Sequence, residues 1–168
     1  MHIVLNLIAI AALTSAIPIS AAMQQGGRVA DPKVKDVWKP AKTPSGGTSW
    51  TVLEQTKLND RTDKKTKIIY TKPIFPAPVR ALDGKQVKVA GWMMPLDSSK
   101  KQTRWVMLGY PPGCPFHFHA LPNQFIEVLS PSGVPTSETK MFVMTGTMEL
   151  TGYDESGIFY RLKNARPG

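Results

Sequence analysis

One short loop of the chain holds the side chains best suited to binding a metal ion. Cys114, His117 and His119 lie within six consecutive residues. On an extended backbone, residues two positions apart point to the same side, with Cα atoms about 6.6 Å apart. Two imidazoles at that spacing can reach one ion, and Cys114 can fold back as a third ligand. Zinc accepts such mixed sulfur and nitrogen sets, and copper does too, so the loop predicts a transition-metal site.

The number of ligands indicates what such a site would do. A structural zinc site normally has four protein ligands, whereas a catalytic or transfer site keeps one position open. The loop supplies three, and Glu127, Asp97, a methionine or water could fill the fourth position. We therefore expect capture and transfer of an ion. Asn123 and Gln124 follow the loop, and we expect their amides to orient the ligands, to fix the loop, or simply to cap the start of a strand.

Two other interpretations of the loop stay open. Cys114 could be a nucleophile, with His117 or His119 as the base and Asn123 as the orienting amide. Such partners are usually distant in sequence, so we expect no enzyme activity. Alternatively, Cys114 and both histidines are ordinary packed residues, and the domain is a ligand-free interaction module.

The start of the chain has the pattern of a secretory signal peptide. Residues 3–17 form an apolar run without a charge, and Ser20 and Ala22 are the small residues before a cleavage position. The run is short for a membrane-spanning helix. We expect residues 1–22 to be a signal peptide, residues 23–47 a flexible leader rich in Gly and Pro, and residues 48–168 one domain in the periplasm.

Composition narrows the possible partners. The chain has 168 residues, a net charge of +9 and a single Cys, which excludes an internal disulfide. The basic residues are spread along the chain, and export removes most nucleic acids, so we expect no nucleic-acid partner. A basic exported protein can instead meet an anionic membrane surface or an acidic protein. The single Cys114 could be free, metal-bound or crosslinked to a second chain.

The second half of the chain has the period of β-strands. Apolar residues alternate along five segments, bounded by turn residues; these segments are 86–95, 104–110, 123–129, 139–150 and 158–163. Five short strands predict a mainly β fold, a small five-stranded antiparallel OB-like barrel, with a sandwich as the alternative. Gly91 and Gly146 lie in mid-strand, where a barrel needs bulges or tight bends.

The segment before the barrel is less regular. Thr48 or Ser49 is placed to cap a short N-terminal helix that contains Trp50. Residues 59–65 are polar and predict a turn, and residues 67–71 predict a short strand. Three prolines follow within residues 73–78, and they predict an extended run without a helix.

Several motifs together resemble one bacterial family. They are Leu-Asp-Gly-Lys at 82–85 running into Gly-Trp-Met-Met-Pro at 91–95, the loop with Cys114 followed by Leu-Pro-Asn-Gln at 121–124, and the closing segments 144–148 and 157–162. From about Trp50 to Arg166, the chain is similar to the exported domain of unknown function 3299. That resemblance implies an exported, periplasmic or lipid-anchored protein. Members of this family often lie beside transporter components, some in zinc-responsive gene sets, which implies a role in metal handling.

The resemblance also assigns residues. It carries over Cys114 as the family cysteine, either His117 or His119 as the family histidine, and the Asn-Gln pair at 123–124. The loop departs from the family pattern, since two residues separate Cys114 from His117 and a single proline precedes the Asn-Gln pair. We therefore expect a periplasmic protein that binds zinc, or copper, and passes it to a membrane transporter or another periplasmic protein. No small-molecule substrate is indicated.

Overall fold

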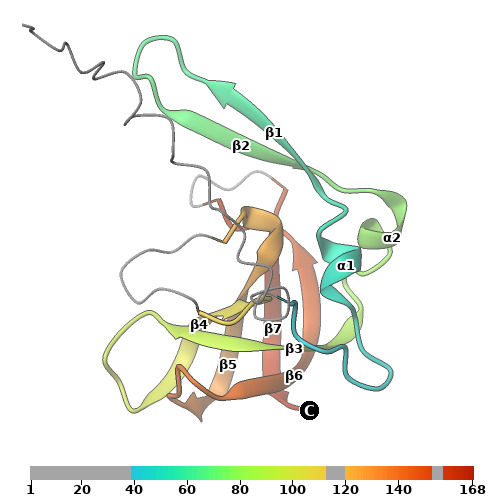
Figure 1. Cartoon of the computed structure of the whole chain (residues 1–168), viewed down its shortest axis with the longest axis vertical. Helices are drawn as coiled ribbons and strands as arrows, with labels where there is room; N and C mark the ends of the chain where they lie inside the picture. Colours follow the sequence, from blue (N-terminus) through green and yellow to red (C-terminus); the bar gives the residue numbers. More distant parts are fainter. Residues whose placement is uncertain (1–38, 113–119, 153–156) are drawn as a thin grey trace, which may run out of the picture. The chain divides into compact units, whose positions relative to one another are not determined.

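Five strands close into a barrel (Figure 1). They are β3 (Gln86–Pro95), β4 (Lys101–Leu108), β5 (Phe125–Pro135), β6 (Met141–Leu150) and β7 (Tyr160–Pro167). The order around the barrel is β3-β4-β5-β7-β6. This computed structural model describes residues 39–112, 120–152 and 157–168. The predicted fold class, mainly β with a small OB-like barrel and a short N-terminal helix, is confirmed.

The barrel is mixed rather than wholly antiparallel. Strand β7 lies between β5 and β6; it pairs antiparallel with β6 and parallel with β5, where Glu127 faces Arg161 and Val128 faces Leu162. The remaining pairs are antiparallel, as predicted. The antiparallel pairs require β3, β5 and β7 to run in one direction and β4 and β6 in the other, so β5 and β7 are parallel where they meet.

Gly91 and Gly146 allow close contacts between neighbouring strands. A Cβ atom on Gly91 would lie 2.5 Å from the carbonyl oxygen of Leu108, and one on Gly146 would lie 2.7 Å from that of Lys163. The register between β6 and β7 shifts at Gly146, between Thr145 and Thr147. The predicted irregularity at Gly146 is therefore a real shift in pairing, whereas Gly91 is needed for its small size.

Side chains of the barrel form two apolar clusters on opposite faces of the sheet. The main core is inside and includes Trp105, Met107, Ile126 and Val128. Residues next to these along β4 and β5 point to the other face, because successive side chains of a strand alternate. There a smaller cluster contains Val106, Leu108, Phe125 and partly buried neighbours.

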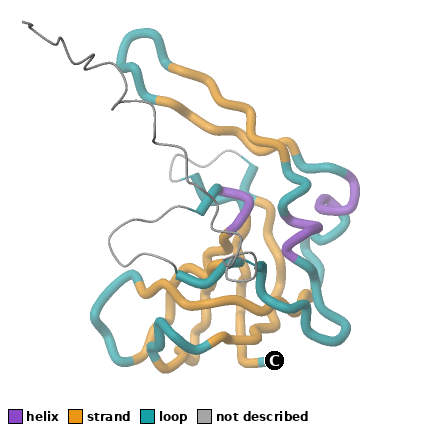
Figure 2. The backbone as a smooth tube through the Cα atoms, in the orientation of Figure 1, coloured by secondary structure: helices purple, strands orange, loops and turns teal. Residues whose placement is uncertain are grey.

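A short helix, α1 (Trp50–Leu53), packs on the barrel (Figure 2). Its N-cap is Ser49, whose Oγ accepts a hydrogen bond from Thr51 N at 3.1 Å, as the sequence predicted. Trp50 is buried, and its Nε1 donates to the carbonyl oxygen of Ala90 on β3 at 2.7 Å. The helix is only one turn long, and its two buried side chains, Trp50 and Leu53, attach it to the barrel core.

The segment after α1 differs from the prediction. Strand β1 (Lys57–Thr62) pairs antiparallel with β2 (Ile69–Ile74) as a separate two-stranded sheet. The predicted turn over residues 59–65 was therefore wrong in its first half, because pairing with β2 supplies the backbone hydrogen bonds that its polar side chains do not indicate. Residues 77–80 are also not extended but form α2 (Ala77–Arg80). Proline is tolerated in the first turn of a helix, where backbone N–H groups lack helical partners.

The last residues of the predicted leader contact the barrel. Ala41 is buried, and its backbone N–H donates to the carbonyl oxygen of Gly109 at 2.8 Å. Thr48 N donates to Lys88 O at 2.8 Å, which holds the segment along β3. The predicted signal peptide, residues 1–22, and the rest of the leader lie outside the described residues. Among the helices that are described, none has the length and apolar character needed to span a membrane.

Candidate functional site

The two ends of the loop between β4 and β5 are held together by hydrogen bonds; we call the residues that make these bonds the base of the loop. Gly109 N donates to Gln124 O at 2.9 Å and so joins the two ends of the loop. A one-turn 3-10 helix, η2 (Pro122–Gln124), leads from the loop into β5. The predicted ligands Cys114, His117 and His119 belong to this loop, but they lie outside the described residues. Within residues 39–112, 120–152 and 157–168, no three acidic, Cys or His side chains come together as a metal site.

Asn123 connects the end of the loop to the segment after α1. Its Nδ2 donates to the carbonyl oxygens of Glu54 and Thr56, both at 3.1 Å. The side chain is buried, and its Oδ1 has no hydrogen-bond partner among the described residues. A buried acceptor without a donor costs free energy, so this atom is suited to a donor that the described residues do not supply. The two bonds from Nδ2 attach the end of the loop to the residues that follow α1.

Glu54 is the centre of the same network. Its Oε1 accepts hydrogen bonds from Tyr110 Oη at 2.7 Å and from Gln124 Nε2 at 3.2 Å. The Oε1 of Gln124 in turn accepts from Leu121 N at 3.1 Å. One carboxylate therefore holds a residue from each end of the loop. Gln124 thus connects the end of the loop to Glu54. The contacts of Glu54 and Tyr110 were not predicted from the sequence.

Tyr160 of β7 anchors this network to the barrel core. Its hydroxyl lies 2.7 Å from the carbonyl oxygen of Leu53, to which it donates, and 2.6 Å from Thr56 Oγ1. Leu53 and Thr56 lie on either side of Glu54 in sequence. The two hydrogen bonds of Tyr160 therefore attach the turn that carries Glu54 to strand β7. The base of the loop is thus built from α1, η2, β4 and β7, which are distant in sequence.

Two tyrosines at this base make stability sensitive to alkaline pH. Burial, together with the hydrogen bond and charge of Glu54, raises the pKa of Tyr110 to about 12. Burial also raises the pKa of Tyr160 to about 12, from an ordinary value of 10.0. Below pH 10 both groups are neutral in the folded and unfolded chain, and their contribution to stability is complete. As the pH rises from about 10 to about 12, the unfolded tyrosines lose protons first, so the free energy of unfolding should fall.

The measurement is urea unfolding at several values between about pH 9 and pH 11. A variant with Tyr110→Phe and Tyr160→Phe should show a shallower fall with pH than the unchanged chain. If the free energy of unfolding falls equally steeply with pH in the double variant, Tyr110 and Tyr160 are not the cause of the loss.

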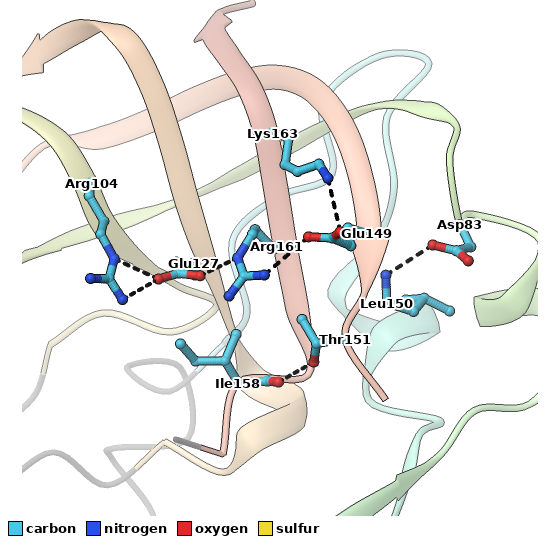
Figure 3. A network of polar contacts seen from close by, with 9 residues as sticks. All are labelled: Asp83, Arg104, Glu127, Glu149, Leu150, Thr151, Ile158, Arg161 and Lys163. Carbon is cyan, nitrogen blue, oxygen red and sulfur yellow. Dashed lines mark hydrogen bonds and ion pairs between the residues drawn. The ribbon is translucent and has the colours of Figure 1, made fainter. Parts of the chain in front are cut away.

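A chain of ion pairs crosses the outer wall of the barrel (Figure 3). Glu127 on β5 lies between Arg104 on β4, with Nε at 2.7 Å, and Arg161 on β7, with Nε at 2.5 Å. Glu149 on β6 continues the chain, 3.1 Å from Arg161 Nη1 and 2.9 Å from Lys163 Nζ. The hydrogen bond from Lys163 is the main reason that the pKa of Glu149 is lowered. These five side chains tie four neighbouring strands together.

The same side chains line an open depression of about 340 Å³, together with Leu129. Each charged group there already has an oppositely charged group at hydrogen-bond distance. These ion pairs therefore connect neighbouring strands and do not form a site for an added ion. Only 2% of the Glu127 side chain is exposed, and each of its oxygens faces an arginine. Asp97 is also engaged, because its Oδ1 accepts from Ser99 N and Gln102 Nε2, each at 2.8 Å. Neither carboxylate is a good fourth ligand for the loop.

The comparisons with known proteins agree with the motifs. The family model described as "Protein of unknown function (DUF3299)" matches residues 27–164. The chain belongs to this family. A crystal structure of a DUF3299 family protein from Pseudomonas aeruginosa PAO1 aligns with a TM-score of 0.44 and 26% identity, over 54% of this chain and 65% of that one. The chain therefore spans just under two thirds of that relative. No curated protein matches the chain.

In this DUF3299 domain, the residues that could not be predicted from the sequence, Glu54 and Tyr110, contact residues that are distant in sequence. Gln124 and Glu54 are 70 positions apart, and Tyr110 and Glu54 are 56 positions apart. Nothing near Glu54 in the sequence marks it as the support of a loop. Asn123 and Gln124 were singled out because they lie at the end of the loop, four and five positions after His119, and match the Asn-Gln pair of the family.

Proposed function

We propose that this protein is a metal-binding accessory protein that captures a transition metal, zinc first, and passes it to a partner protein. The ligands would be Cys114, His117 and His119. Every His and Cys that follows the predicted signal peptide falls in this one loop. The observation that carries the proposal is that a partly buried hydrogen-bond network connects both ends of the loop.

The base of the loop fits the proposed ligands chemically. A histidine that binds a metal through one ring nitrogen usually donates its other N–H to an oxygen acceptor. Asn123 Oδ1 is a buried acceptor without a partner among the described residues, and it lies four positions after His119 in sequence. Fixing both ends of the loop lowers the conformational entropy lost when the ligands gather around an ion, and this raises affinity. Bound zinc would act as cargo, held by soft ligands with one position open for exchange.

The proposed location and partners follow from the same chemistry. The pattern of residues 1–22 supports export, which would place the loop in the periplasm. A site with an open position favours transfer to another protein over turnover, so we propose a membrane transporter or another periplasmic protein as the recipient. No enzyme activity is proposed.

The test is the zinc and copper affinity of the reduced mature protein, compared with a variant in which Cys114→Ala, His117→Ala and His119→Ala are combined. We expect one tightly bound ion per chain, lost in the triple variant. Affinity should also fall as the pH drops below about 6 to 7, because protons compete for imidazole and thiolate.

Glu138→Ala serves as the control for weak binding by surface carboxylates, since Glu138 is exposed. It should leave affinity unchanged. Equal, weak binding by the unchanged protein and the triple variant would refute the metal site. The domain would then be interpreted as an interaction module without a ligand.

A further inference from the structure

The β1–β2 sheet has one strongly basic face. Residues directly opposite each other on paired strands share a face, and the neighbouring pairs use the other face. The pairs Lys57 with Ile74, Asn59 with Lys72, and Arg61 with Tyr70 therefore lie together. This face has three cations and no acidic residue. The two strands form their own sheet and do not pair with strands of the barrel (Figure 1).

The turn between β1 and β2 adds further cations. Lys64, Lys65 and Lys67 are exposed there. Asp63 shapes the turn, because its Oδ1 accepts hydrogen bonds from Lys65 N at 2.9 Å and from Thr66 N at 2.8 Å. These bonds lower the pKa of Asp63 and direct its carboxylate toward the backbone of the turn. The lysines, rather than the aspartate, therefore define the outer surface of the turn.

The charge of this segment is concentrated. Residues 57–74 contain six basic and two acidic residues, a net charge of 6 − 2 = +4, out of +9 for the whole chain. The second acid, Asp60, lies on the other face, where it accepts a hydrogen bond from Thr71 Oγ1 at 2.7 Å. Lys57 and Arg61 on the basic face thus lie opposite Ile74 and Tyr70 rather than opposite an acidic residue.

Isoleucines are exposed in the same segment. Ile68, Ile69 and Ile74 are 50%, 63% and 53% exposed, and they are among the most exposed large apolar residues described. Ile68 lies in the turn beside the lysines, and Ile74 shares the basic face. Ile69 is the first residue of β2 at the turn end of the hairpin, where it pairs with Thr62 on the face that carries Asp60. Exposed apolar side chains beside several cations are the composition of segments that lie in the headgroup region of anionic bilayers.

We propose that the β1–β2 hairpin, residues 57–74, docks on an anionic phospholipid bilayer. The lysines and Arg61 attract the lipid phosphates, and Ile68 and Ile69 enter the boundary with the acyl chains. A single-stranded nucleic acid would also be attracted by the charge. Single-stranded nucleic acid binds proteins by stacking its successive bases on aromatic rings, however, and residues 57–74 contain a single aromatic residue, Tyr70. It would also leave no role for the exposed isoleucines. The proposal does not depend on the metal site.

Sedimentation of the mature chain with phospholipid vesicles tests the proposal. We expect binding to vesicles of phosphatidylcholine with phosphatidylglycerol, little binding to phosphatidylcholine alone, and weaker binding at high salt. Combining Lys57→Gln, Lys64→Gln and Lys65→Gln should lower the partition coefficient by at least about tenfold. The matched control combines Lys85→Gln, Lys100→Gln and Lys140→Gln, which removes the same charge at exposed positions elsewhere. It should have a much smaller effect.

Insertion of the turn is tested separately. Replacing Ile68→Ser and Ile69→Ser should remove the binding that persists at high salt, while thermal unfolding shows that the barrel is intact. Equal losses in the two lysine variants would overturn the proposal, because attraction would then come from total charge. Binding of single-stranded DNA in place of anionic vesicles, lost in the hairpin variant, would also overturn it and assign the hairpin to a polyanion.

Discussion

Replacing Trp50 by alanine is expected to lower the free energy of unfolding by about 3 to 5 kcal/mol. Only 1% of this residue is exposed, and its indole N–H donates to Ala90 O at 2.7 Å. It also packs against Gly109, where an added Cβ would lie 2.7 Å from the indole ring. The substitution removes one of the two buried side chains that attach α1 to the core, and it opens a cavity next to the start of the loop. Urea unfolding followed by circular dichroism measures the loss.

A pair of milder substitutions separates packing from hydrogen bonding. Trp50 and Trp105 are both fully buried, but Trp105 Nε1 has no partner among the described residues. Replacing either by phenylalanine removes similar volume, and Trp50→Phe also leaves Ala90 O without its donor. We expect Trp50→Phe to cost about 1 kcal/mol or more beyond Trp105→Phe. Equal costs would show that the hydrogen bond at Trp50 contributes nothing measurable.

The barrel could be predicted from the sequence because its signal is local. Along β3, Val87 and Val89 are buried and point inward, and Met144 and Met148 do the same on β6. Alternation of this kind can be read within a few residues. The parallel contact of Glu127 with Arg161 could not be predicted, since it depends on where β7 enters a barrel whose other strands are already paired.

Strand β1 was missed for the opposite reason. Of its residues, Leu58 alone is apolar, so the strand has no alternating pattern. Its backbone is held by pairing with β2, and the side-chain pattern of β1 does not predict that pairing. Residues 77–80 were also misjudged, because proline was taken as a helix breaker. At the start of a helix, its fixed backbone angle and missing N–H are both tolerated.

The candidate metal ligands could be predicted from the sequence, but the residues that hold the ends of their loop could not. Residue type and spacing singled out Cys114, His117 and His119, and the resemblance to the family singled out the Asn123-Gln124 pair at the end of the loop. Their support depends on contacts that cross the fold. Glu54, which holds both ends of the loop, comes from the turn after α1, and Tyr160, which fixes that turn, comes from the last strand. A single sequence contains no sign of such distant pairings.

Asn123→Asp is expected to cost about 3 kcal/mol or more of the free energy of unfolding, although it changes the size of the side chain very little. Asn123 is only 6% exposed, and its Nδ2 donates to the carbonyl oxygens of Glu54 and Thr56. A carboxylate in this place turns two hydrogen bonds into two repulsive contacts and leaves both carbonyls without a donor. The base of the loop should loosen, and zinc affinity should fall if the loop binds metal. Urea unfolding and a zinc titration measure the two effects separately.

Asn59→Asp is the matched control, because Asn59 on β1 is exposed and the chemical change is the same. Surface substitutions of this kind usually change stability by less than about 0.5 kcal/mol. The loss at Asn123→Asp should shrink at acidic pH, since a protonated carboxyl group can again donate one hydrogen bond to a carbonyl oxygen. A loss that is similar at both positions, or independent of pH, would mean that the two bonds of Asn123 do not hold the loop. A loss of stability with unchanged zinc affinity would mean that the loop binds zinc without the support of its base.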